Sequence, residues 1–229
     1  LLVMEKLKVI LTGGTGMVGE GVLMECLDHP LVEQVLVIGR RPTGFQHQKL
    51  SECLLQNLSD WSAVTNEISG YNTCLFCLGT TSLGKEEEYK KVTYELTLQA
   101  ARSLVSQNPG MVFCYISGAG TDSSEKGRLM WARVKGKTEN DLKKLPFRAV
   151  YNFRPGILIP TPGQKKILSF YHYLKGLFFV IKALVPGWVC SMKELGQAMI
   201  HAAASGYARD TIEIADIKAL AREGRLDTN

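Results

Sequence analysis

One stretch, from Leu7 to Arg41, constrains the fold of this chain more than any other. It begins with a short apolar strand at 8–11 and a glycine-rich loop at 12–19. A helix to about His29 and a second apolar strand at 34–38 follow. Strand, glycine loop, helix and strand in this order predict a βαβ unit that binds a dinucleotide.

The glycine spacing in the loop fits what a pyrophosphate requires. Gly13 permits a tight turn after the strand, and Gly16 lets the backbone approach the phosphates without a side chain in the way. Gly19 lets the helix pack closely on the strand, and the helix N-terminus then faces the anion. The loop residues expected to contact the cofactor are Gly13, Thr15, Gly16, Met17, Val18 and Gly19. A purely structural glycine-rich turn is the alternative.

The end of the second strand bears on the choice of cofactor. NAD-binding units usually carry an Asp or Glu about twenty residues beyond the glycines, whereas an arginine there suits a 2′-phosphate. This chain has Gly39, Arg40 and Arg41 at that place. The sequence therefore favours NADP(H) over NAD(H), with a solvated arginine pair as the alternative.

The chain continues as alternating apolar strands and helices, which is typical of a doubly wound parallel α/β sheet. Strands are expected around 53–55 and at 73–78, 111–116 and 149–153, and helices at 61–68, 86–107 and around 131–139. We expect residues 1–160 to form the Rossmann core, since prolines at 160 and 162 and Gly163 interrupt the pattern. Residues 161–229 would form a small C-terminal lobe on the same domain, with a helix near 193–204 and a strand around 211–214.

Ligands of such sheets bind at the carboxyl ends of the strands. We therefore expect Leu78, Gly79 and Thr80, at the end of the fourth strand, to line the ribose on the nicotinamide side. Asn57 and Leu58, after the third strand, would contact the adenine, although a loop asparagine and a core leucine are equally good interpretations.

Composition argues against several other classes of protein. Of the 229 residues, 45% are hydrophobic, and the formal charge of +5 comes largely from eight Lys and Arg at 126–148. That segment reads as the solvated face of a helix, and no nucleic-acid partner is expected. The six cysteines lie mostly in apolar runs and the four histidines are scattered, so we expect core thiols and no metal site. No Gly-x-Ser-x-Gly motif supports a hydrolase.

The first residues show no export signal, and Met4 is a plausible start, so a cytoplasmic location is expected. The apolar stretch 167–188 includes His172, Lys175 and Lys182, which argues against a transmembrane helix. Its apolar side chains still need to be buried against something. The stretch could be a substrate lid, a homodimer face or a membrane-surface helix, in that order of preference.

Several motifs together resemble a known superfamily. The loop at 12–19, Leu78-Gly79-Thr80-Thr81, Ile116-Ser117 and Arg154-Pro155-Gly156 are similar to those of the short-chain dehydrogenases/reductases. More narrowly, 77–81, 134–136 and 153–156 resemble the atypical group of Tat-interacting oxidoreductase-like proteins. The resemblance covers about residues 6–160, and it implies that Pro155 contacts the cofactor.

The resemblance also implies the site chemistry. In that superfamily a Ser, a Tyr and a Lys four residues after the Tyr carry the reaction. Ser117 would hold the substrate oxygen, and Lys135 would bond the nicotinamide ribose and lower the pKa of its neighbour. The tyrosine position holds Trp131, whose indole N–H has no useful acidity. Tyr115, two residues before Ser117 on one strand face, is a weaker substitute acid.

The leading hypothesis is an NADP(H)-binding oxidoreductase-like protein that passes hydride to or from a carbonyl or alcohol with an impaired proton relay. Because Trp131 replaces the acid, a regulatory protein that senses NADP(H) without turnover is the second hypothesis. An enzyme like a nucleotide-sugar epimerase or dehydratase is the third. The sequence names no substrate.

Overall fold

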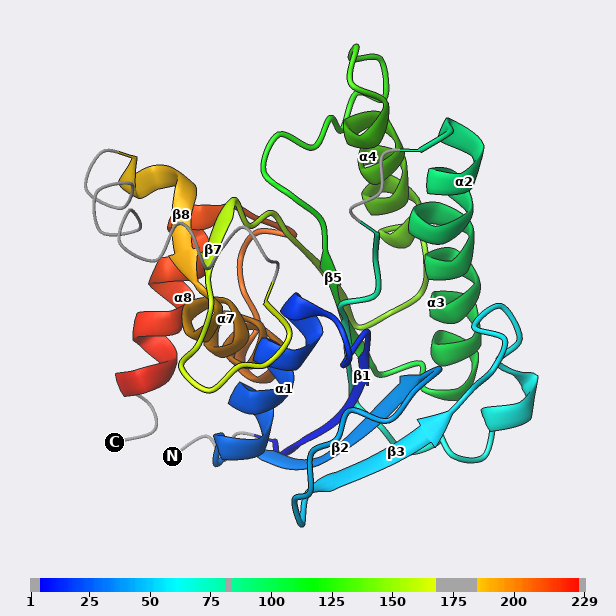
Figure 1. Ribbon diagram of the computed structural model, residues 1–229, viewed down its shortest axis with the longest axis vertical. Helices are drawn as coiled ribbons and strands as arrows, with labels where there is room; N and C mark the ends of the chain where they lie inside the picture. The colour runs from blue at the N-terminus through cyan, green and yellow to red at the C-terminus, as the bar shows by residue number, and fades with distance from the viewer. Residues whose placement is uncertain (1–4, 81–83, 168–184, 227–229) are drawn as a thin grey trace.

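The computed structural model describes residues 5–80, 84–167 and 185–226. Its centre is a parallel seven-stranded sheet in the order β3-β2-β1-β4-β5-β6-β9, which confirms the predicted doubly wound Rossmann fold (Figure 1). The strands are β1 Leu7–Thr12, β2 Val32–Gly39, β3 Leu50–Leu54, β4 Thr73–Phe76, β5 Val112–Ile116, β6 Ala149–Phe153 and β9 Thr211–Ile212. A separate two-stranded sheet pairs β7 Ile157–Ile159 with β8 Val189–Ser191.

Helices cover both faces of the sheet, with α1, α7 and α8 on one side and α2, α3 and α4 on the other (Figure 1). Their bounds are α1 Met17–Asp28, α2 Glu86–Lys90, α3 Leu96–Gln107, α4 Met130–Leu142, α7 Met192–Ser205 and α8 Ile214–Leu226. There are also two short 3₁₀ turns, η1 Ser62–Val64 and η3 Pro186–Trp188, and a π turn, η2 Lys91–Glu95.

The strands are apolar along their whole length because both faces are covered. Successive residues of β1 show this, since Ile10 belongs to the core under α3 and Leu11 to the core under α1 and α7. Cys74 and Cys77 likewise contribute to opposite cores, as expected for positions three apart in a strand. The thiols are free, in agreement with the prediction of core cysteines.

The predicted helix at 61–68 is wrong, because the structure has only the single 3₁₀ turn η1 there. Asp60 does act locally, and its Oδ1 accepts hydrogen bonds from the N–H of Ser62 at 3.0 Å and from its hydroxyl at 2.5 Å. Such side-chain bonds compete with helix formation. Trp61 and Ile68 are still buried. The apolar spacing therefore identified core residues correctly, although the segment is not a helix.

The helical stretch 86–107 is continuous, but it contains a π turn, η2 Lys91–Glu95, between α2 and α3. A π turn holds more residues than an α turn, which shifts the buried face along the chain. Around the π turn the buried side chains are therefore Tyr89, Thr93 and Thr97, while Ala100 and Leu104 further along are buried as the period predicts. Val92 and Leu96, which the helical period placed on that face, are only half-buried.

The segment after residue 160 contributes to the main sheet and to its cover. β9 pairs with β6, with Asn152 opposite Thr211 and Phe153 opposite Ile212, and α7 packs against α1 and α8. The strand predicted through Ile214 is shorter, since α8 begins at that residue. No helix among the described residues is long and apolar enough to cross a membrane, and most of the apolar stretch 167–188 lies outside them.

Candidate functional site

The glycine loop between β1 and α1 has the close backbone contacts that its spacing predicts. Gly13 has φ +73°, and a Cβ there would lie 2.6 Å from the carbonyl oxygen of Cys77. The N–H of Gly16 donates to the Gly13 carbonyl at 2.9 Å. A Cβ at Gly19 would overlap that same carbonyl oxygen, so this glycine lets the helix pack on the loop itself.

The start of α1 is left open for an anion. Its N-cap residue is Gly16, which offers no side-chain acceptor to the first turn. The first N–H groups of a helix have no partner within the helix, so those of Met17, Val18 and Gly19 are available to an anion that approaches the helix end. The helix dipole adds positive potential at the same place.

A pocket lies beside this loop, at the end of β2. It is lined by Gly13, Gly14, Thr15, Val37, Gly39, Arg40, Arg41, Leu58 and Leu78. The fold thus brings the loop, the two arginines and the ends of three strands together, and no carboxylate is among these described lining residues. Asn57 is not among them either, and its Oδ1 accepts from the N–H and hydroxyl of Ser59. We call this the loop pocket.

A second pocket lies at the carboxyl ends of β4, β5 and β6, and we call it the Trp131 pocket. It is lined by Thr80, Tyr89, Gly118, Ala119, Trp131, Lys135, Pro155, Gly156, Ile157 and Trp188. Most of these groups are apolar, and Lys135 is the charged one among them. Trp188 and Ile157 at its mouth are 58% and 37% exposed. Gly79 lines neither pocket, and a Cβ there would meet nothing within 4 Å.

Lys135 is held against the end of β5. Its Nζ donates to the backbone carbonyl of Ser117 at 2.8 Å. Desolvation lowers the pKa of Lys135 to about 8, and the negative charge of Glu139, one helical turn away, opposes this shift only in part. The Ser117 hydroxyl lies 2.9 Å from that of Thr121, and Ser117 is not among the residues that line the Trp131 pocket.

The aromatic residues near the site differ in what they can do. Trp131 lines the pocket from α4, as the resemblance placed it. Tyr115 is 1% exposed, its ring lies 6.3 Å from that of Phe76, and burial raises the pKa of its hydroxyl. Tyr89 does line the pocket, and its one signal in the sequence is a place in the helical period.

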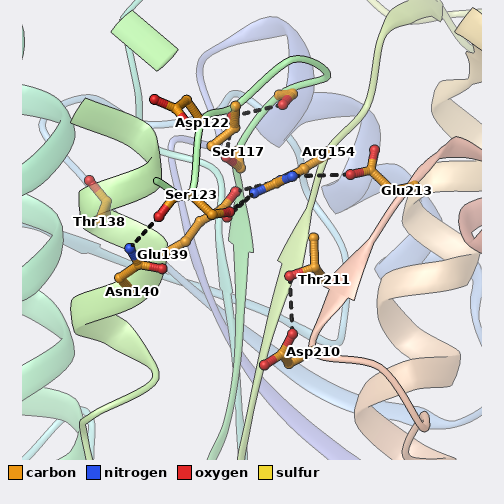
Figure 2. A network of polar contacts seen from close by, with 12 residues as sticks. Ser117, Asp122, Ser123, Thr138, Glu139, Asn140, Arg154, Asp210, Thr211 and Glu213 are labelled. Carbon is orange, nitrogen blue, oxygen red and sulfur yellow. Dashed lines mark hydrogen bonds and ion pairs between the residues drawn. The ribbon is translucent and has the colours of Figure 1, made fainter. Parts of the chain in front are cut away.

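A polar network connects α4 to the strand ends (Figure 2). The guanidinium of Arg154, just after β6, donates to both carboxylate oxygens of Glu139 on α4, at 3.0 Å from Nε and 2.6 Å from Nη2. It also donates to the Ser123 hydroxyl at 2.6 Å and to Glu213 at 3.2 Å. Burial lowers the pKa of Arg154, but the hydrogen bonds and charge of Glu139 outweigh this and raise it. The network fixes the helix that carries Trp131 and Lys135 against the adjoining β-strand ends.

The chain is similar in sequence to fungal proteins named for mitochondria. It is 26% identical over 206 residues to protein fmp52, mitochondrial, of Emericella nidulans, covering 85% of this chain and 86% of that protein. A protein named fmp52-1, mitochondrial, of Aspergillus oryzae is 30% identical over 163 residues, covering 68% and 66%. No protein-family model matches the chain. These names overturn the expected cytoplasmic location. That expectation rested on the lack of an export signal and on reduced cysteines. Neither feature distinguishes the cytosol from other reducing compartments.

Solved structures share the fold at low sequence identity. An oxidoreductase of the short-chain dehydrogenase/reductase family from Burkholderia thailandensis superposes with a TM-score of 0.66 at 12% identity, covering 98% of both chains. The enzyme WbmF of Bordetella bronchiseptica, in complex with NAD⁺, gives 0.65 at 13%, covering 96% and 78%. A UDP-N-acetylglucosamine 4-epimerase from Methanobrevibacter ruminantium gives 0.64 at 15%, covering 92% and 77%.

These comparisons do not test the narrower resemblance to the Tat-interacting group, which stays a prediction. The expected superfamily fold is confirmed by the strand order and by these neighbours together. The chain therefore has the Rossmann fold of the NAD-binding short-chain dehydrogenases/reductases and of the epimerases related to them in structure.

Proposed function

We propose that this protein is an oxidoreductase that binds NADP(H) across the two pockets and transfers hydride to or from a carbonyl or alcohol substrate. The observation that carries the proposal is the lining of the loop pocket. There the glycine loop that leads into α1 and Arg40–Arg41 lie around one cavity that has no carboxylate among its described lining residues. The structural neighbours with NAD⁺ support the dinucleotide, while the arginine pair supports the phosphorylated form.

The chain's own residues have separable roles in this proposal. The N–H groups at 17–19 hold the pyrophosphate, and Arg40 and Arg41 pair with the 2′-phosphate, because charge-assisted guanidinium–phosphate bonds are strong and directional. Lys135 bonds the ribose near the Trp131 pocket. When bound, the nicotinamide supplies or accepts the hydride.

The Trp131 pocket indicates the kind of substrate. Trp131, Trp188 and Ile157 present apolar surface, and the described lining carries a single charged group, Lys135. A carbonyl or alcohol with an apolar substituent fits such a surface better than a highly charged metabolite. We also propose a mitochondrial location, on the names of the relatives in Emericella nidulans and Aspergillus oryzae.

A regulatory protein that binds NADP(H) without turnover is the second candidate, and the observation that favours it is Trp131 at the position of the family acid. An epimerase or dehydratase, as in some structural neighbours, would need a proton relay at the same place. The second candidate predicts the same dinucleotide affinity as the first but no reaction with any carbonyl.

The test is an equilibrium titration with NADPH and with NADH, followed by intrinsic tryptophan fluorescence. The double variant Arg40→Ala/Arg41→Ala should weaken NADPH binding by roughly 10- to 100-fold, since a hydrogen bond to a charged group contributes about 1.5–3 kcal/mol. NADH binding should stay within about twofold, as should both affinities in the control Arg102→Ala, an exposed arginine on α3.

Equal loss of NADPH and NADH binding in the double variant would contradict the 2′-phosphate assignment. If the unmodified protein bound neither dinucleotide, the proposed function itself would be wrong, and the glycine loop would be a structural turn only.

A further inference from the structure

The Trp131 pocket lacks an acid where the resemblance places one, yet a tyrosine of another helix is among its lining residues. We propose that Tyr89 is a catalytic residue that delivers the proton to the substrate oxygen during carbonyl reduction. The inference rests on the proposed function, and it assigns a residue to the step for which Trp131 is unsuited.

The position of Tyr89 follows from the fold. Tyr89 lies on α2, which packs against α4, and Arg133 of α4 pairs with Glu86 of α2 at 3.1 Å. This ion pair holds the two helices together one turn before Tyr89 and close to Lys135. Tyr89 is only 3% exposed, but it is among the residues that line the pocket.

The backbone after Tyr89 provides a second, independent observation. The π turn η2 begins at Lys91, directly beyond α2. Single π turns in α-helices are uncommon and occur often at functional sites, because they move the side chains on either side out of the regular helical register. Here the π turn follows Tyr89 directly, and beyond it Thr93 is buried in place of Val92, so that Tyr89 and Thr93 share one buried face.

The surroundings of Tyr89 suit a proton donor. Burial raises the pKa of its hydroxyl, and the hydroxyl of Thr93, one turn further on, opposes part of this rise. The phenol therefore stays protonated near neutral pH. Tyr115 on β5 is the titrating group that interacts with it, and Lys135 on α4 lines the same pocket, where a positive charge would favour the phenolate that forms when the proton leaves.

The other polar groups near the pocket are less suitable. Among its described lining residues Tyr89 is the only phenol, and Thr80 carries an alkyl hydroxyl that is a much weaker acid. Ser117 has its hydroxyl beside Thr121, and Tyr115 is enclosed by the core. Lys135 donates to the Ser117 carbonyl and is the remaining rival, which the test below separates from Tyr89.

The step balances without a further reactant. The carbonyl carbon gains a hydride, whose electron pair comes from the reduced nicotinamide, and the electron pair of the C=O π bond moves to oxygen. That oxygen takes the proton as the O–H bond of Tyr89 breaks, and the product is an alcohol. The phenolate then regains a proton from water, which reaches the pocket past the exposed Trp188 and Ile157.

The experiment compares Tyr89→Phe, Trp131→Tyr and the double variant with the unmodified protein. NADPH affinity is measured by fluorescence titration, and NADPH oxidation is followed with a set of apolar aldehydes, ketones and quinones. Tyr89→Phe should lower kcat/KM by about 10²- to 10⁴-fold, with NADPH affinity unchanged within about twofold. The double variant should recover activity, because a phenol at 131 stands four residues before Lys135 on the same helix face. The control Tyr94→Phe removes a phenol from the same helical stretch outside the pocket and should keep its activity.

Two further measurements do not depend on the activity of a variant, and the second does not require a folded variant either. The near-ultraviolet phenolate absorbance of the unmodified protein minus that of Tyr89→Phe gives the ionisation of Tyr89, and NADP⁺ should lower its midpoint, because a positive ring beside the phenol favours the phenolate. In the unmodified sequence, replacing tyrosine with 3-fluorotyrosine should move the alkaline limb of the kcat/KM profile to lower pH.

Full activity in Tyr89→Phe, or a pH profile that fluorotyrosine does not move, would overturn the proposal, and the second result would point to Lys135 as the acid. NADPH binding without reduction of any tested carbonyl would also overturn it. Loss of dinucleotide binding in the unmodified protein is a different result, since it contradicts the proposed function before any proton is transferred.

Discussion

Replacing Arg154 with methionine would remove the cation from Glu139, whose side chain is only 1% exposed. Two hydrogen bonds, at 3.0 and 2.6 Å, would be lost together with the charge pairing. Leaving one partner of a buried pair uncompensated costs about 3–5 kcal/mol, which is a large share of the roughly 5–15 kcal/mol that stabilises an ordinary domain. We therefore expect Arg154→Met to lower the free energy of unfolding by about 3 kcal/mol or more.

The measurement is urea unfolding at neutral pH, followed by tryptophan fluorescence and extrapolated linearly to water. The matched control is Arg148→Met, because Arg148 pairs with Glu5 at 3.3 Å while both side chains stay about half exposed, at 45% and 62%. Such surface pairs contribute about 0–1 kcal/mol. Arg154→Met/Glu139→Leu should recover most of the loss, since apolar replacement of a buried pair is often neutral. If Arg154→Met and Arg148→Met differed by less than about 1 kcal/mol, the view that this network holds α4 in place would be wrong.

Two more predictions concern the glycine loop and the site lysine. Gly19→Ala should weaken NADPH binding and destabilise the fold by about 1–3 kcal/mol despite the better helix propensity of alanine, because its Cβ would overlap the Gly13 carbonyl. Gly110→Ala, where a Cβ meets nothing within 4 Å, is the control for titration and urea unfolding. Lys135→Met should raise the urea midpoint near neutral pH, since folding there buries a charged amine. This difference in urea midpoint between the variant and the unmodified protein should shrink as pH rises above about 8, because the folded state releases the Lys135 proton before the unfolded state does. A midpoint difference that grew over that range would contradict the lowered pKa of Lys135.

Much of the sheet could be predicted because its strands are buried on both faces. Continuous apolar runs such as that of β5 leave little choice of structure, and every predicted strand from β1 to β6 overlaps the observed one. The glycine loop was predictable for a related reason, since φ +73° at Gly13 and the close approach at Gly19 both exclude a side chain. Single-residue constraints of this kind are visible in the sequence itself.

Features that depend on competition between local and tertiary contacts were not predictable. The segment 61–68 has the apolar spacing of a helix, but the Asp60 carboxylate bonds the N–H and hydroxyl of Ser62 and only one 3₁₀ turn forms. The Ser117 hydroxyl lies beside that of Thr121, and this position depends on how the loop after β5 folds back. Neither outcome changes the hydrophobic pattern.

The placement of Tyr89 shows why a motif and a pocket can lead to different assignments. Short-chain dehydrogenases/reductases carry the acid and the lysine on one helix. A sequence with Trp131 at the acid position therefore predicts an impaired proton relay. In the structure, α2 lies beside α4 above the neighbouring strands β4 and β5, and a π turn of five residues directly after α2 shifts which of the following side chains are buried. A helical period read from one sequence cannot report that shift, because the pattern around Tyr89 fits a straight helix nearly as well. What the chemistry requires is a phenol near Lys135 at the ends of these strands, and the fold can supply it from either helix.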